Sequence, residues 1–148
     1  MHVSVRTLHG IRTVSKMAEE SDQVHWNASE LAQQKYIDQD YLIQILNQLK
    51  DSGIIGSKKG PHGGYYLERS PGDISLGDII KSLEGPTVLS PCTQPEHSDC
   101  EIIEECSTQS VLSIIAGKID GLLDKITIKD IVEESELPQN QVDEAPTL

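Results

Sequence analysis

The sequence predicts a mainly α-helical protein with one small β-hairpin. Three observations predict this class: two apolar stripes at helical spacing joined by a short turn, a glycine-rich segment between two short strand-like runs, and one long apolar run in the second half. A helix pair followed directly by a hairpin is the pattern of a winged helix-turn-helix. We therefore expect such a domain first and a long helix after it.

The helices of the first half follow from periodicity and caps. Apolar side chains recur every three to four residues at the start of the chain, which predicts an amphipathic helix over residues 4–20. Asn27 with Glu30 three residues later is the capping-box pattern of a short second helix. A third, longer helix is expected to begin near Asp38 and to end at Gly53.

The next segment predicts the hairpin. Residues 54–59 and 65–68 are typical of short strands, and residues 60–64, Gly-Pro-His-Gly-Gly, are typical of the turn between them. The tip carries positive or titratable side chains among small residues, which suits contact with a phosphate backbone or a minor groove. These side chains are Lys58, Lys59 and His62.

The second half is dominated by one long helix. Ser75 caps a helix that ends at Gly85, and the apolar run from Val111 to Ile126 predicts a helix of about twenty residues, on the order of 30 Å long. Its apolar stripe is too wide for a solvated surface helix. It either packs on its own domain or pairs with its copy in a second subunit, and we favour the homodimer.

All three cysteines lie in one loop, with seven residues between Cys92 and Cys100 and five between Cys100 and Cys106. Thiolates gathered in this way suit an iron–sulfur cluster or zinc, although the paired C-x2-C spacing of most structural zinc sites is missing. Three free thiols are the plain alternative. A thiol sensor is another, in which Cys100 and Cys106 oxidise to a disulfide.

The charge distribution and composition limit the kinds of function that the protein can have. The net charge is −12, but residues 1–84 hold nine Lys and Arg against eleven Asp and Glu, whereas residues 85–148 hold three against thirteen. The nearly neutral first half permits a DNA face. We expect no membrane span, because the sequence has no long apolar run. We expect a cytoplasmic protein, because no signal peptide is recognisable and an odd number of cysteines argues against a disulfide framework. No residue pattern indicates an enzyme.

These segments together resemble the iron–sulfur cluster regulator family, winged-helix repressors of the IscR, NsrR and RirA type with clusterless relatives such as CymR. The resemblance covers about residues 1–132. It rests on the three-cysteine loop and on five further segments, which are residues 41–49, 52–55, 59–67, 74–80 with 84–85, and 127–132.

The resemblance implies a homodimer whose long helices cross and which binds a palindromic operator in double-stranded DNA. Asp38, Gln39, Tyr41 and Gln44 would enter the major groove, where glutamine can pair with adenine. Lys58, Lys59 and His62 would enter the adjacent minor groove. Asp38 and Asp40 are unfavourable near phosphates, so we expect modest and strongly salt-dependent affinity.

The same resemblance implies an iron–sulfur cluster on Cys92, Cys100 and Cys106. The longer first spacing is most like that of the RirA and NsrR types, and this resemblance favours a 4Fe–4S over a 2Fe–2S cluster. Relatives take a fourth ligand from positions where this chain has Gln109 or Leu8. The remaining candidates are His9 of the partner subunit and, locally, His97, Asp99, Glu101, Glu104 and Glu105.

The implied organisation is a DNA-binding domain (1–85), a cluster-binding loop (86–106), a dimerisation helix with a short terminal helix (107–132) and a disordered acidic tail (133–148). The implied function is a transcription regulator whose operator affinity depends on the cluster, in response to iron, nitric oxide or redox state. Two alternatives stay open. One is a clusterless thiol-redox regulator, and the other is an acidic protein-interaction module without DNA binding.

Overall fold

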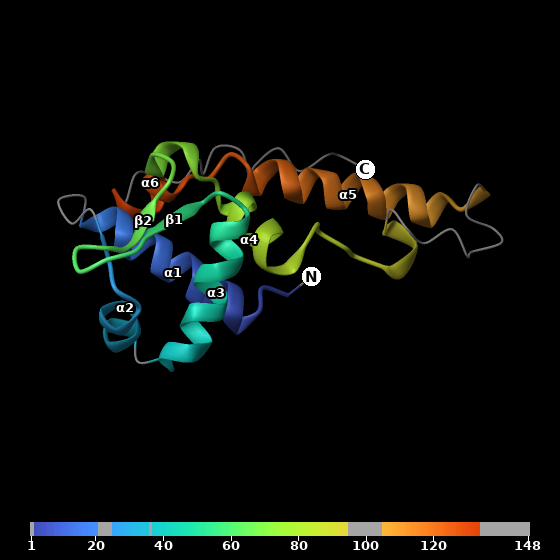
Figure 1. Ribbon diagram of the computed structural model, residues 1–148. Coiled ribbons are helices and arrows are strands. Elements are labelled where there is room, and N and C mark those ends of the chain that lie inside the picture. The colour runs from blue at the N-terminus through green and yellow to red at the C-terminus, as the bar shows by residue number, and fades with distance from the viewer. Residues whose placement is uncertain (1, 21–24, 36, 95–104, 134–148) are drawn as a thin grey trace.

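A computed structural model describes residues 2–20, 25–35, 37–94 and 105–133 (Figure 1). It confirms the mainly helical class with one two-stranded antiparallel hairpin. The main elements are, in chain order, α1 (Val5–Glu19), α2 (Ala28–Lys35), α3 (Gln39–Asp51), β1 (Ile55–Lys58), β2 (Gly64–Leu67), α4 (Leu76–Glu84), α5 (Ser107–Leu123) and α6 (Ile128–Val132). Two 3-10 turns, η1 (Pro71–Asp73) and η2 (Pro91–Thr93), complete the described part.

The helix-turn-helix is built on a single apolar core. α1 packs on α3, α4 and α6, and α2 packs on α3. The inner face of α3 is completely buried because its apolar residues recur at helical spacing. The fully buried side chains of this face are Leu42, Ile45, Leu46 and Leu49.

The predicted capping box of α2 is confirmed. The backbone N–H of Glu30 donates to Asn27 Oδ1 at 2.8 Å, and the N–H of Asn27 donates to Glu30 Oε2 at 3.4 Å. Two donors of the first turn are thereby satisfied, which explains why this short helix begins where it does.

The hairpin is attached to the helices through Trp26. β1 and β2 pair in antiparallel register from Ile55 opposite Leu67 to Lys58 opposite Gly64. Trp26 adds a one-residue bridge on the other side of β2, because its N–H and C=O both bond to Tyr65, at 2.8 and 2.7 Å. Trp26 is itself only 2 % exposed. The hairpin is therefore held against the core by this bridge.

The segments around α4 and α6 close the domain. Capping boxes at Ser75 and Thr127 start these two helices. The two caps also form a bridge with each other, since the N–H of Leu76 donates to the carbonyl of Ile126 at 2.7 Å. The end of the long helix is thus tied to the start of α4.

α5 extends away from the domain (Figure 1). It begins at Ser107, four residues before the apolar run that starts at Val111, and its last residue is Leu123, three residues before the end of that run at Ile126. It begins before the run because the side chain of Cys106 caps it, and it ends with Asp124 as the C-cap because the N–H of Lys125 bonds back to the carbonyl of Leu122. None of the described helices has the length and hydropathy needed to cross a membrane. The predicted acidic tail lies outside the described residues beyond Glu133.

Candidate DNA interface and cysteine centre

The outward face of α3 is held in place by a cap and by the core. Asp38 Oδ1 accepts the N–H of Tyr41 at 2.9 Å, so the carboxylate is used to start the helix. Gln39 and Gln44 are exposed, whereas Tyr41 is half-buried against the core. A helix with one buried face and free amide side chains on the other has the geometry of a major-groove reader.

The tip of the hairpin presents the three side chains predicted from the sequence. Lys58, Lys59 and His62 are all exposed. The turn between them closes because Gly60 takes a φ of +113° and its carbonyl accepts the N–H of Gly63 at 3.0 Å. Gly64 has a φ of +144°, and a Cβ there would lie 2.6 Å from the carbonyl oxygen of Trp26. Glycine at this position lets the wing approach the helices.

A polar network inside the domain was not predicted from the sequence. Arg6 donates to Gln48 Oε1 at 2.8 Å, and Gln48 Nε2 donates to the carbonyl of Ser82 at 2.7 Å. The hydroxyls of Ser52 and Ser82 also lie 2.9 Å apart. This network joins α1, α3 and α4, so α4 is linked by hydrogen bonds to α3, the helix that has the geometry of a major-groove reader. No local pattern marks it, because each member is an ordinary polar residue far from its partners in sequence.

The structure places two of the three cysteines beside the long helix. Cys92 lies in η2, with its sulfur 3.3 Å from the hydroxyl of Ser90, and η2 packs against α5. Cys106 is the N-cap of α5, and its sulfur accepts the N–H of Gln109 at 3.4 Å. Both thiols are free and partly buried. Cys100 lies outside the described residues.

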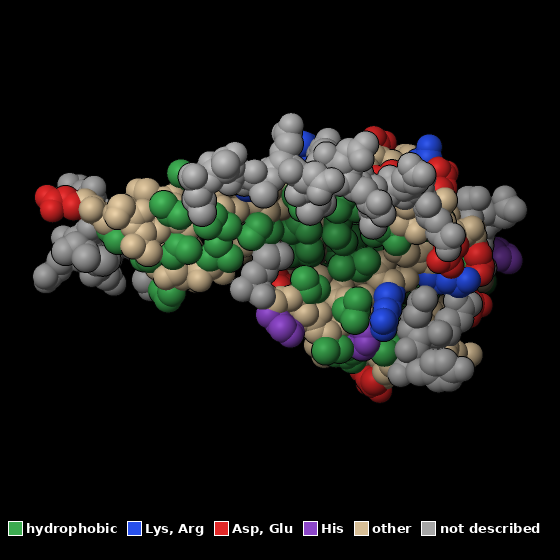
Figure 2. Space-filling model, turned by 180° about the vertical axis from the view of Figure 1, so that it is seen from behind, with side chains coloured by type: hydrophobic (Ala, Val, Ile, Leu, Met, Phe, Trp, Pro, Cys, Tyr) green, Lys and Arg blue, Asp and Glu red, His purple; other side chains and the backbone are tan. Residues whose placement is uncertain are grey.

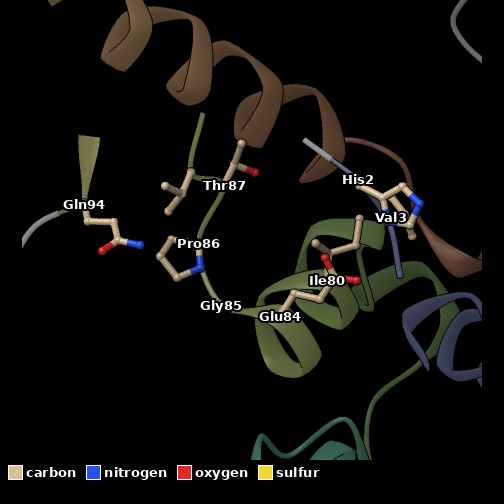
Figure 3. Close-up of a pocket in the computed structure, with 9 residues that line it drawn as sticks. His2, Val3, Ile80, Glu84, Gly85, Pro86, Thr87 and Gln94 are labelled. Carbon is tan, nitrogen blue, oxygen red and sulfur yellow. The ribbon is translucent and has the colours of Figure 1, made fainter. Parts of the chain in front are cut away.

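A cavity of about 250 Å³ lies where the cysteine segment leaves α4, and Figure 3 shows residues that line it. Its polar side includes Glu84, whose carboxylate accepts the N–H of Ser4 at 2.7 Å. Burial opposes ionisation of Glu84, but hydrogen bonds from Thr7 and Ser4 outweigh it, so the pKa of Glu84 lies below its ordinary value. The start of α1 is thereby tied to the end of α4.

The predicted fourth ligands divide between two regions. His9 lies on α1 with its ring edge-on to Tyr41, at a centroid distance of 5.8 Å, and its Nδ1 is buried without a hydrogen-bond partner among the described residues. Glu105 is exposed immediately before Cys106. His97, Asp99, Glu101 and Glu104 lie outside the described residues. The identity of the fourth ligand stays a prediction.

One face of α5 is apolar and open to solvent. Val111 and Ile115 are 54 % and 41 % exposed, and Leu122, two turns further, is 40 % exposed. Ile114 beside them is 60 % exposed. Figure 2 shows apolar side chains exposed along the projecting helix. Only Ala116, on the opposite side, is buried among the described residues of α5. An apolar stripe of this kind indicates a missing partner surface.

The chain matches known regulators over most of its length. The family described as "Rrf2: Iron-dependent Transcriptional regulator" matches residues 3–134. The HTH-type transcriptional regulator CymR of Bacillus subtilis is 28 % identical over 131 residues, which are 88 % of this chain and 89 % of CymR.

Two solved structures are similar in fold and sequence. One is reported as CymR (YrzC), the global cysteine regulator of B. subtilis, with a TM-score of 0.71 and 25 % identity over 92 % of this chain and 99 % of that one. The other is IscR of T. potens, with a TM-score of 0.69 and 28 % identity over 94 % of this chain and 91 % of that one.

Proposed function

The chain belongs to the Rrf2 family of iron-dependent transcriptional regulators, and from this premise we propose how its DNA binding is controlled. It is a DNA-binding transcription regulator, and its named relatives are regulators, not enzymes. We propose that it binds a palindromic operator as a homodimer. We further propose that Cys92, Cys100 and Cys106 hold an iron–sulfur cluster that sets its operator affinity.

The position of Cys106 carries the proposal. Its sulfur receives a backbone N–H at the first turn of α5, and the turn that contains Cys92 packs on the same helix. A thiolate that binds iron is stabilised by such donors, because they offset its negative charge. Thiolates on one short stretch of chain are also the donor set that iron–sulfur clusters require. The residues therefore fit the group.

The homodimer is supported by the exposed stripe on α5. Val111, Ile115 and Leu122 would be covered if the same face of a second copy packed against them. Removal of apolar surface from water contributes roughly 25 cal/mol per Å². The pairing would hold two winged domains at the ends of crossed helices, as a palindromic operator requires.

On the DNA side, we assign Gln39 and Gln44 to the major groove and Lys58, Lys59 and His62 to the minor groove. All five side chains are exposed. Asp38 and Tyr41 act from the same end of α3, where Asp38 caps the helix and Tyr41 seats it on the core. The amides supply base recognition, and the lysines supply sequence-independent attraction to phosphates.

An iron–sulfur cluster, when bound, supplies a centre that responds to electrons, iron supply or nitric oxide. Cys106 marks the start of α5, and Cys92 lies on the segment that follows α4. A change in what these sulfurs bind is therefore expected to move α4 relative to α5. Ser82 would pass that movement to α3 through Gln48. We favour 4Fe–4S over 2Fe–2S, with His9 of the partner subunit as a candidate fourth ligand.

A clusterless thiol-redox regulator is the second candidate. It is favoured by the two free, partly buried thiols of Cys92 and Cys106 on neighbouring segments. It is also favoured by the likeness to a protein described as a global cysteine regulator. The third possibility, an acidic interaction module without DNA binding, is disfavoured by family membership.

The test is anaerobic purification followed by visible absorption, iron and sulfide analysis, and DNA binding to a palindrome selected by the wild type from random-sequence DNA. Cys92→Ser, Cys100→Ser and Cys106→Ser should each lose colour, iron and sulfide, and should change operator affinity. A colourless wild type whose DNA binding responds to a thiol oxidant would replace the cluster proposal with the thiol one. Binding without sequence preference would contradict both.

A further inference from the structure

α5 is joined to the DNA-binding domain near its C-terminal end. There the N–H of Leu76 bonds to the carbonyl of Ile126, and the N–H of Ile128 donates to the carbonyl of Ile74 at 2.9 Å. The helix then extends away from this junction (Figure 1). Its direction relative to α3 is therefore decided mainly by what holds this junction in place.

An ion pair and a glycine lie at the junction. Lys81 Nζ donates to both carboxylate oxygens of Asp124, at 2.7 and 2.8 Å. Asp124 is the C-cap residue of α5, and Lys81 lies in the last turn of α4. One turn earlier on α4, Gly77 is buried directly beneath the same carboxylate, and a Cβ at position 77 would collide with Asp124 Oδ1.

The contact is thus specified from two sides. The bidentate bond pulls the carboxylate towards α4, and the absence of a side chain at Gly77 lets it come close. The hydrogen bond to Asp124 raises the pKa of Lys81, although burial acts in the opposite direction. A contact of this kind restricts rotation of one helix about the other more than it stabilises the fold, because exposed ion pairs contribute little stability.

We propose that Gly77, Lys81 and Asp124 form a clamp that sets the angle between α5 and the DNA-binding domain, and thereby the half-site spacing that the dimer accepts. These three are positioning residues that act through α4. The inference rests on the proposed homodimer and its palindromic operator. It goes beyond them by naming the residues that decide which spacing is read.

A small rotation at the clamp produces a large displacement at the far end of α5. A helix of 17 residues is about 25 Å long, so a rotation of roughly 5° at one end moves the other end by about 2 Å. Successive base pairs are about 3.4 Å apart along the DNA, and half-sites must lie on one face of the duplex. A small change at the junction therefore becomes a substantial part of one base-pair step. Ser82, next to Lys81, bonds to Gln48 of α3, so the clamp lies beside the link to the recognition helix.

The experiment uses the full chain and a palindrome selected by the wild type from random-sequence DNA. Duplexes with one central base pair inserted or removed are compared with the selected spacing. The wild type should lose roughly tenfold or more in affinity on each altered duplex. In Lys81→Ala and Asp124→Asn the loss should shrink to about threefold or less, because the angle is no longer restrained.

Matched variants separate the clamp from other effects. Lys129→Ala removes the same charge from α6 and should keep the wild-type spacing ratio. The charge exchange Lys81→Asp with Asp124→Lys should restore much of that ratio, and Gly77→Ala should weaken it with both charges present. Thermal unfolding and binding to a single half-site should stay unchanged in Lys81→Ala and Asp124→Asn.

Folded, dimeric Lys81→Ala and Asp124→Asn proteins with the wild-type spacing ratio would overturn the clamp. A wild type that is monomeric, or that selects no palindrome, would instead contradict the proposed function itself. The oligomeric state and the selection are measured first on the wild type, so the two failures are distinguishable.

Discussion

Gln48 of the recognition helix donates through Nε2 to the backbone carbonyl of Ser82 in α4 at 2.7 Å. The same amide accepts from Arg6 of α1 at 2.8 Å. One side chain therefore joins three helices of the DNA-binding domain. α4 in turn leads to the cysteine segment and contacts α5. The bond between Gln48 and Ser82 is thus a direct polar connection between α3 and α4, the helix that leads to the cysteine segment.

Replacement of Gln48 tests this connection. Gln48→Leu should lower the free energy of unfolding by about 1–3 kcal/mol, because the carbonyl of Ser82 and the guanidinium of Arg6 lose their partner in a partly buried place. Urea unfolding measures the loss. Asn47→Leu changes an exposed neighbour on the same helix and should change the stability by less than about 0.5 kcal/mol. Equal effects of the two substitutions would contradict a structural role for this bond.

The two parts of the DNA interface should respond differently to substitution. Gln44→Ala should weaken binding to the selected operator by about 1–3 kcal/mol and relax base preference at one position, since an amide that reads a base is lost. Lys59→Ala should weaken binding to all sequences alike and reduce the slope against salt by about one. Binding titrations over a salt series measure both.

Lys129→Ala serves as the control for charge, because it removes an exposed lysine from α6 and not from α3 or the hairpin. It should leave the salt slope unchanged. If Lys59→Ala and Lys129→Ala behaved alike, the hairpin would not be the phosphate-contacting element. If Gln44→Ala weakened binding to every sequence equally, α3 would not read bases through this amide.

Cys106 is expected to have two separable roles. As an N-cap it accepts the N–H of Gln109, and as a proposed ligand it binds iron through the same sulfur. Serine can keep the cap but is a poor ligand for an iron–sulfur cluster, whereas alanine can do neither. In iron-free, reduced protein, Cys106→Ala should therefore be less stable than the wild type by about 1 kcal/mol, and Cys106→Ser should not.

Both variants should lose iron and sulfide after anaerobic purification. Thermal unfolding of the iron-free forms and metal analysis of the purified forms are the two measurements. Retention of the wild-type iron content by Cys106→Ser would argue against a ligand role. Equal stability of all three iron-free proteins would argue against the cap.

The lowered pKa of Glu84 predicts that the stability of the fold depends on pH in the acidic range. Because its folded-state pKa is below the ordinary value of 4.5, its hydrogen bonds to Ser4 and Thr7 stabilise the fold above that pH. The contribution is lost as the pH falls through the folded-state pKa. The difference in stability between the wild type and Glu84→Gln should be below about 1 kcal/mol at neutral pH, since solvent screens an exposed carboxylate.

That difference should shrink further as the pH falls below about 4.5. Urea unfolding from neutral to acidic pH measures it. Glu68→Gln, an exposed glutamate on the hairpin side of the domain, is the comparison. If the difference in unfolding free energy between the wild type and Glu84→Gln increased in acid, the pKa of Glu84 would not be lowered in the folded state.

Local signals predicted the helices and the hairpin well. The capping pair Asn27 and Glu30, the cap at Ser75 and the hairpin after α3 were all visible, because helix starts and tight turns depend on residues only a few positions apart. α5 begins at Ser107, which is also the first residue of the segment 107–132 assigned to the dimerisation helix and the short terminal helix. Apolar periodicity begins at Val111, but the cap that starts the helix is a cysteine, a residue that sequence rules do not count among N-caps.

The candidate site was predictable only in its composition. The sequence names the cysteines and the exposed residues of α3 and the wing, since these residue types are marked by their chemistry and spacing. Their mutual placement needs the tertiary structure, which packs the turn of Cys92 on α5 and aims one face of α3 outward.

By itself, the sequence determined the class of the protein: the order of its elements, its cysteine-bearing loop and its apolar long helix. Only the tertiary structure decided how these parts are joined, through Trp26 with Tyr65, Gln48 with Ser82, and Lys81 with Asp124. The physical reason is the separation in sequence between the residues that make each contact. Caps and periodicity are set by neighbours in the chain, whereas the angle of α5 and the seat of the wing depend on pairs of residues about 35 to 45 positions apart, which become neighbours only once the core has formed.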